Sequence, residues 1–166
     1  NTTGDNNTGV GSGALISATT ANHNTAVGRA ALSQTSIGAS NTAVGKDALK
    51  DNTTGTGNTA VGDSAAGNCT TADGNTAVGS NSLFTNTTGD GITSIGRVAL
   101  YFNTTGSDNT AVGRAALKAN TTASNNTAVG RDALTANTIG TSNVAVGTGA
   151  LITNTTGTQN TAIGHL

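Results

Sequence analysis

Few residues of this 166-residue sequence are of the types that act in catalysis, and those few do not recur together. His23 and His165 could act as general bases, and Cys69 could act as a nucleophile once its thiol is ionised. These three residues occupy different positions, here called stations, of a repeat of 17 residues. No nucleophile is therefore paired with a base at a recurring position. The sequence therefore predicts a protein that is not an enzyme, with no catalytic residues and no cofactor.

The aspartates could bind a cation if several of them met in one turn. Asp5, Asp73 and Asp90 share one station, and Asp108 stands at the next one. Calcium-binding β-rolls carry several carboxylates per turn in a G-G-x-G-x-D pattern, which this sequence lacks. We therefore expect no metal site.

The basic residues form the strongest charged pattern. Five of the seven basic residues directly follow a repeated glycine, and Asp63 stands at the same station in another copy. A column of this kind either keeps an edge solvated, which prevents lateral aggregation, or binds anionic glycans; the first interpretation is favoured. The candidate strip is Arg29, Lys46, Arg97, Arg114 and Arg131.

The overall charge and hydropathy exclude two classes of partner. The formal net charge of −1 argues against nucleic acid, because phosphate binding requires clustered Lys and Arg. No run of 18 apolar residues occurs, so we expect no membrane insertion. In a secreted eukaryotic or archaeal protein, Asn-x-Thr sequons could carry glycans, whereas in a bacterial or phage protein they would only reflect repeat composition. The sequons begin at Asn1, Asn6, Asn52, Asn68, Asn86, Asn103, Asn120, Asn125 and Asn154.

A strict 17-residue period organises all these residues. One glycine recurs from Gly11 to Gly164 without an insertion or deletion, and the consensus unit is N-T-A-V-G-x-x-A-L-x-x-N-T-T-G-x-x. Dense Thr, Asn and Gly disfavour helix, and the unit is too short for a helix–turn–helix repeat. The period predicts an all-β protein, a parallel β-solenoid of ten 17-residue coils, forming a single domain over residues 1–166. The glycines of the period are Gly11, Gly28, Gly45, Gly62, Gly79, Gly96, Gly113, Gly130, Gly147 and Gly164.

The positions before each glycine predict which side chains share a face. Side chains alternate along a strand, so the Thr and the Val or Ile of N-T-A-V-G lie on one face and the small residue between them on the other. The exchange of Thr for Val144 suggests that the Thr column is partly buried, and Val and the later Leu column are expected to anchor the core. A column restricted to Ala, Ser or Gly suggests close approach by another backbone. We therefore expect a parallel homotrimer packed around the small column.

The remaining columns predict hydrogen-bonded stacks. The N-T-T-G stretch is expected to form a second extended segment, which gives two or three short strands per coil. Coils stacked at ~4.8 Å make a rod roughly 48 Å long, in which an asparagine ladder is interrupted by Ile92. Thr53 to Thr155 form a second ladder at every seventeenth residue. The asparagine ladder consists of Asn24, Asn41, Asn58, Asn75, Asn109, Asn126, Asn143 and Asn160.

These motifs resemble known surface proteins. N-T-A-V-G-x-x-A-L with N-T-T-G between copies resembles repeats of bacterial and phage tail-fibre proteins, often those ending in an endosialidase-type chaperone domain. It is also similar to the head repeats of YadA-like trimeric autotransporter adhesins; the matching stretches are 24–28, 41–45, 109–113 and 126–130. The resemblance extends over essentially the whole chain and implies a left-handed parallel β-roll, a homotrimer and attachment to a host or matrix. The adhesin repeat is shorter, so the present unit contains an added loop or strand.

The expected function is that of a structural fibre or adhesin segment, extracellular, on a cell surface or on a virion. The pattern starts at Asn1 and runs to Gly164 without atypical capping units, which predicts either a piece of a longer fibre or a filament subunit stacking end to end. Self-association is the main expected partnership, with a host-surface glycan or receptor as a further partner. An ice-binding face is disfavoured, because the strand Thr is expected to point inward with Val.

Overall fold

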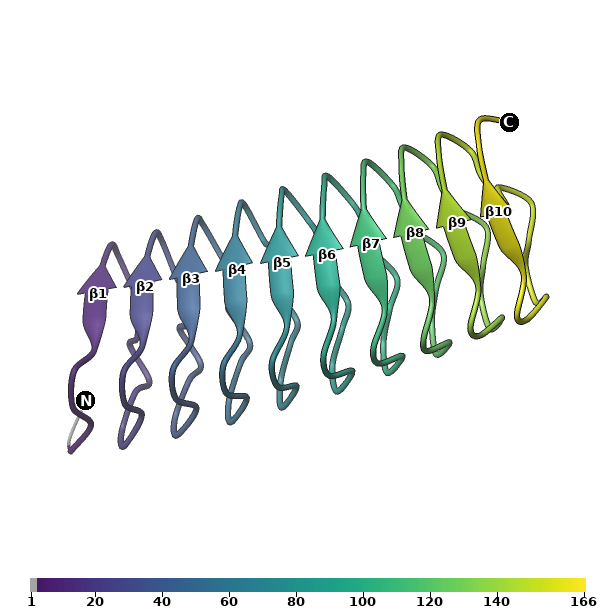
Figure 1. Cartoon of the computed structure of the whole chain (residues 1–166). Helices are drawn as coiled ribbons and strands as arrows, with labels where there is room; N and C mark the ends of the chain where they lie inside the picture. The colour runs from purple at the N-terminus through teal and green to yellow at the C-terminus, as the bar shows by residue number, and fades with distance from the viewer. Residues whose placement is uncertain (1–2) are drawn as a thin grey trace.

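The computed structural model describes residues 3–166, and its regular secondary structure is ten short parallel strands. Figure 1 shows them side by side along one side of the molecule, with the rest of each coil closing behind. The described residues contain no helix. The strands are β1 (Thr8–Val10), β2 (Thr25–Val27), β3 (Thr42–Val44), β4 (Thr59–Val61), β5 (Thr76–Val78), β6 (Thr93–Ile95), β7 (Thr110–Val112), β8 (Thr127–Val129), β9 (Val144–Val146) and β10 (Thr161–Ile163).

Each strand pairs with the next strand of the sequence, in a register of 17 residues. In the sheet order β1 to β10, residues at the same position of the repeat pair with one another, as Thr42 with Thr59 and Ala43 with Ala60. Parallel neighbours require a connection that returns the chain to its starting side, and the remaining 14 residues of each unit supply it. The predicted all-β parallel solenoid with a 17-residue spacing is thus confirmed.

The prediction of two or three strands per coil was wrong, because each unit contains a single three-residue strand. The N-T-T-G stretch bonds to the next coil without forming a ladder. The amides of Thr53 and Thr54 both donate to the carbonyl of Thr70, at 2.8 and 3.3 Å. Two successive amides that share one acceptor cannot alternate their directions as strand residues do, so the chain bends there.

The small column lies inside each coil, and this corrects the expected trimer contact. Ala26, Ala43 and Ala60 have no exposed surface, whereas Val27, Val44 and Val61 on the opposite face are 37–38% exposed. The backbone that approaches the small residues closely is the far wall of the same coil. Ser94 of the small column shows this, because its hydroxyl lies 2.7 Å from the hydroxyl of Ser82 on that wall. The prediction that three copies pack around the small column was therefore wrong.

The leucine column fills the interior from the far wall. Leu32, Leu49 and Leu100 are completely buried and have φ angles of 47–49°, in the left-handed region. A left-handed residue costs roughly 1–2 kcal/mol, and burial of a leucine side chain gains roughly 1.5–3 kcal/mol. The burial therefore offsets the local strain of the turn that directs each leucine inward.

Candidate functional site

The most extensive feature of the surface is the outer face of the sheet, which we call the T-x-V face. It consists of the first and third residues of β1 to β10: Thr8, Val10, Thr25, Val27, Thr42, Val44, Thr59, Val61, Thr76, Val78, Thr93, Ile95, Thr110, Val112, Thr127, Val129, Val144, Val146, Thr161 and Ile163. These columns contain no charged residue, and the aliphatic column stays 36–38% exposed at Val27, Val44, Val61, Ile95 and Val129. Single exposed apolar residues are normal, but a contiguous column marks an interaction surface.

The strand threonines face outward on this surface. Within residues 3–166, no hydroxyl from Thr25 to Thr127 in this column bonds to another protein group, and these side chains are partly exposed. The expectation that they point inward was wrong, and with it the argument against an ice-binding face. Val144 replaces a threonine because both are β-branched residues suited to a strand, and the exchange does not indicate an interior position.

The candidate basic strip borders the T-x-V face where the strands end. Its side chains are exposed and partly neutralised: Arg29 lies 2.9 Å from Asp47, and Arg114 lies 3.2 Å from Asp132. Lys46 also contacts Asp47, at 3.2 Å. Arg97 forms no ion pair within the described chain. This neutralisation weakens the case for the strip as a binding site for anionic glycans.

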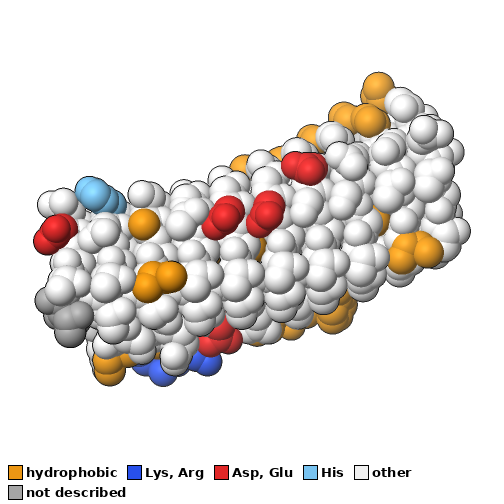
Figure 2. All heavy atoms as spheres, turned by 90° about the horizontal axis from the view of Figure 1, so that it is seen from below, with side chains coloured by type: hydrophobic (Ala, Val, Ile, Leu, Met, Phe, Trp, Pro, Cys, Tyr) orange, Lys and Arg blue, Asp and Glu red, His pale blue; other side chains and the backbone are white. Residues whose placement is uncertain are grey.

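The acidic column borders the same face where the strands begin. The carboxylate of Asp73 accepts the backbone N–H of Thr56 at 2.6 Å, and that of Asp90 accepts the N–H of Asp73 at 2.7 Å. In Figure 2 the acidic side chains stand in a row on this side of the molecule. Because an oxygen acceptor continues the chain of bonds, Ser or Asn also suits the station. No group of three or more His, Cys, Asp or Glu residues that could hold a metal occurs within residues 3–166.

Two asparagine columns inside the rod and one partly exposed threonine column are hydrogen-bonded from coil to coil. In the first column the amide N–H of Asn41 donates to Asn24 Oδ1 at 2.9 Å, and the same pattern recurs along the ladder. At the interruption, the Ile92 N–H still donates to Asn75 Oδ1, but isoleucine offers no acceptor to the next coil. In the threonine column each hydroxyl donates to the next carbonyl, as Thr87 does to Thr104 at 3.0 Å.

The second asparagine column is a structural ladder that sequence reasoning missed. The Nδ2 group of Asn103 donates to Asn86 Oδ1 at 2.8 Å, and Asn120 donates in the same way to Asn103. Each side chain also donates to a carbonyl three residues ahead, which closes the turn. The signal was present in the sequence, because Asn precedes T-T in most copies and a buried amide needs such a stack.

Burial of this column decides which sequons are accessible. The asparagines of four sequons, Asn52, Asn86, Asn103 and Asn120, have no exposed surface. They cannot accept a glycan in the folded rod. Asn6 and Asn125 are exposed, Asn68 and Asn154 are partly exposed, and Asn1 lies outside the described residues.

The residues with catalytic potential lie apart. Cys69 belongs to the second asparagine column and is buried, with its Sγ 3.3 Å from Asn86 Nδ2. Burial raises the pKa of the Cys69 thiol to about 11. His23 and His165 are exposed, and His23 contacts Asn6 at 3.4 Å. This arrangement offers no base that would ionise the thiol.

We expect Cys69 to resist alkylation in the folded protein. At pH 8 iodoacetamide should leave the native chain unlabelled and should label it fully in concentrated guanidinium, as mass spectrometry would record. The ordinary pKa of 9.0 rises to about 11 on folding, so between these values the unfolded chain loses the proton and the folded chain keeps it. Stability should therefore fall as pH rises through this window, more steeply than in the Cys69→Ser variant. Rapid labelling of the native chain would contradict the buried position.

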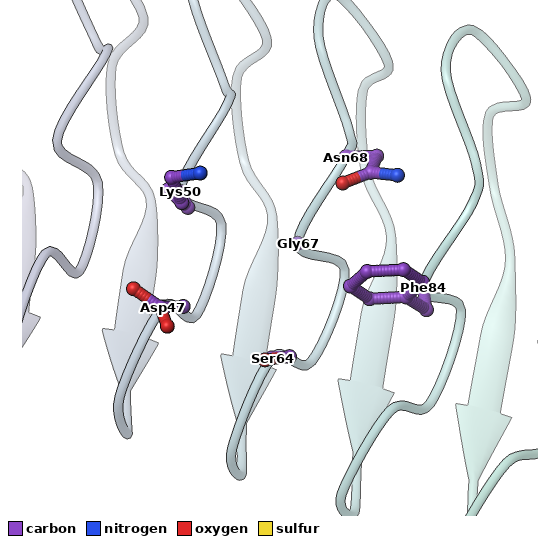
Figure 3. Close-up of a pocket in the computed structure, with 6 residues that line it drawn as sticks. All are labelled: Asp47, Lys50, Ser64, Gly67, Asn68 and Phe84. Carbon is purple, nitrogen blue, oxygen red and sulfur yellow. The ribbon is translucent and has the colours of Figure 1, made fainter.

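A shallow cleft interrupts the surface where Gly67 replaces the larger residues of neighbouring coils. It encloses about 140 Å³ and is lined by Asp47, Lys50, Ser64, Gly67, Asn68 and Phe84. Figure 3 shows the Phe84 ring extending towards Gly67, with Asn68 and Ser64 on either side. Ser64 donates to Asp63 at 2.9 Å, and Asp47 is held by Arg29 and Lys46. The serine hydroxyl therefore donates to an exposed carboxylate, and no histidine lines the cleft.

Residues 3–166 contain no helix that is long and apolar enough to cross a membrane.

Comparisons with known proteins assign neither a family nor a function to the chain. No protein-family model, no curated protein and no solved structure matches this chain. The function must therefore be argued from the geometry of the rod and its surfaces.

Proposed function

We propose that this chain is a non-enzymatic structural rod, a segment of a fibre or adhesin that holds a binding partner away from a cell or virion surface. In this proposal the rods are left-handed and associate laterally as a homotrimer outside the cell. The proposal covers the shaft, and a host-surface glycan or receptor would be its attachment target.

The observation that carries the proposal is the backbone hydrogen bonding that links each coil to the next. Each coil bonds to the next through its strand, through its turns and through side-chain ladders, with like residues in register from β1 to β10. Bending such a rod would stretch bonds on several sides at once. Stiffness along one axis is the property that a shaft requires.

The distribution of reactive groups supports a role without chemistry. The buried thiol, the two exposed histidines and the carboxylates of the cleft belong to different stations of the coil. A catalytic site needs a nucleophile, a base and a stabilising group within hydrogen-bond distance of one another. Repeated stations instead carry structural hydrogen bonds, as the asparagine and threonine columns do.

Small-angle X-ray scattering of variants with added repeats tests the proposal. Duplication of residues 97–113, one full unit, should lengthen the particle by ~4.8 Å and leave its cross-section unchanged. Duplication of residues 97–104 alone should disrupt the register and lower stability. The rods should also resist proteinase K under native conditions. Compact particles whose length does not follow the number of units, or rapid cleavage of the native rod, would contradict a stiff shaft.

A further inference from the structure

We infer that the T-x-V face binds a second copy of this chain, with the two rods parallel and related by rotation about an axis along the rods. This inference rests on the self-association in the proposed function and adds the contact surface and the polarity. The contact surface between copies is then the outward column of valines and isoleucines, and not the small column, which is buried.

The size and composition of the face suit an interface between copies. Ten coils at ~4.8 Å give a length of roughly 48 Å, and the eight residues from the acidic to the basic column, of which three are strand, span at most roughly 20 Å. The resulting area is at most on the order of 1,000 Å², compared with ~800 Å² per partner in a standard interface. Its interior is the uncharged T-x-V face and its borders are charged, which is the usual arrangement of a less polar core with a charged rim.

The charged borders determine the polarity. The acidic column lies where the strands begin, and the basic strip lies where they end, so the two columns flank the T-x-V face on opposite sides. Rotation about an axis along the rod brings the basic border of one copy beside the acidic border of the next. At the level of β6 this places Arg97 near Asp90 of the second copy, and at β7 it places Arg114 near Asp108.

No like charges meet in the parallel arrangement. At the other levels Asp73 would face Ser80, and Asp63 would face Thr56. In an antiparallel face-to-face pair the strands keep their direction, so basic border would meet basic border and acidic border would meet acidic border. Repulsion between like charges disfavours the antiparallel pair, so the parallel arrangement is preferred.

Sedimentation velocity of the whole chain tests the face. Ile95→Lys places a charge in the centre of the aliphatic column and should shift the association constant at least tenfold towards monomer. Thr105→Lys adds the same charge at an exposed loop station away from the sheet and should leave association unchanged. Equal effects of the two variants, or a wild-type chain that stays monomeric at high concentration, would overturn the inference. A wild-type monomer with a rod-shaped scattering profile would leave the stiff shaft intact.

Charge reversal and disulfide capture test the polarity. Arg114→Asp and Asp108→Arg should each weaken association about three- to tenfold, and the double variant should recover it. A mixture of Val144→Cys and Val146→Cys chains should form interchain disulfides, because rotation about an axis along the rods places the first residue of a strand opposite the third residue of the same strand in the second copy. Capture only when Val27→Cys and Val146→Cys are mixed would indicate antiparallel rods and overturn the polarity. Thermal hysteresis by a monomer, abolished by Ile95→Lys, would assign the face to ice instead.

Discussion

Gly113→Ala should destabilise the rod by about 4 kcal/mol, because strain and steric overlap of about 1–3 kcal/mol each act together. Gly113 has a φ of 137°, in a region that side chains with a Cβ rarely adopt. An alanine Cβ there would lie 2.4 Å from the carbonyl oxygen of Gly130, which belongs to the backbone of the next coil. The next coil cannot yield without loss of the 2.7 Å bond from the Gly130 N–H to Val112.

Urea denaturation followed by far-UV circular dichroism measures this effect. A change of about 4 kcal/mol is a large part of the 5–15 kcal/mol that stabilises a typical domain, so the urea midpoint of the variant should fall markedly. Because each coil contacts only its neighbours, loss of the β7 corner should also separate the two halves of the stack.

Gly74→Ala is the matched control. Gly74 also has a positive φ, of 65°, but an added Cβ would meet no atom within 4 Å. Ser40 and Ser142 occupy the same station with similar φ angles, so the backbone tolerates a side chain there. We expect a loss of about 1 kcal/mol. Equal stability losses for the two variants would show that backbone conformation alone, and not the contact between coils, explains the period of the glycine.

The period was sufficient to predict the stacking of coils, because insertion-free repetition leaves one arrangement in which like residues lie over like. It was not sufficient to orient the faces. Alternation places Thr25 and Val27 on one side and Ala26 on the other in either orientation. Hydrophobicity suggested that valine is inside, whereas the width of the coil decides otherwise. The far wall approaches so closely that only a small residue fits, as the Ser82 and Ser94 pair shows.

The sequence was sufficient to predict which residues align in a column of the candidate site, but not which side chains contact them. The basic strip was evident from the residue after each glycine, yet its pairing with Asp47 and Asp132 depends on the turn between coils. The second extended segment was mispredicted because Thr and Asn also suit tight turns in which side chains bond to the backbone. The left-handed φ of Leu100 could not be inferred from composition, since leucine rarely adopts it without burial as compensation.

The second asparagine column contains a natural defect at Cys69, and its repair is expected to stabilise the rod. Asn52 Oδ1 is buried without a hydrogen-bond partner in the described chain, because the residue one coil further is Cys69 where an asparagine would donate. Cys69→Asn should supply the missing donor and gain about 1–3 kcal/mol, the usual cost of a buried unpaired polar group. The space is suitable, since Asn120 occupies the same station in a coil that also has an alanine, Ala123, three residues ahead.

The reciprocal variant Asn103→Cys should introduce the same defect elsewhere. Asn86 Oδ1 and the Gly106 carbonyl would each lose the donor that Asn103 provides, at 2.8 and 2.9 Å. A loss of about 1–3 kcal/mol should appear as a lower urea midpoint with an unchanged slope. Cys69→Ser, whose hydroxyl is too short to reach Asn52, should give no gain. If Cys69→Asn and Cys69→Ser shift the midpoint equally, removal of the thiol rather than completion of the ladder is responsible, and the amide stack contributes less than its geometry indicates.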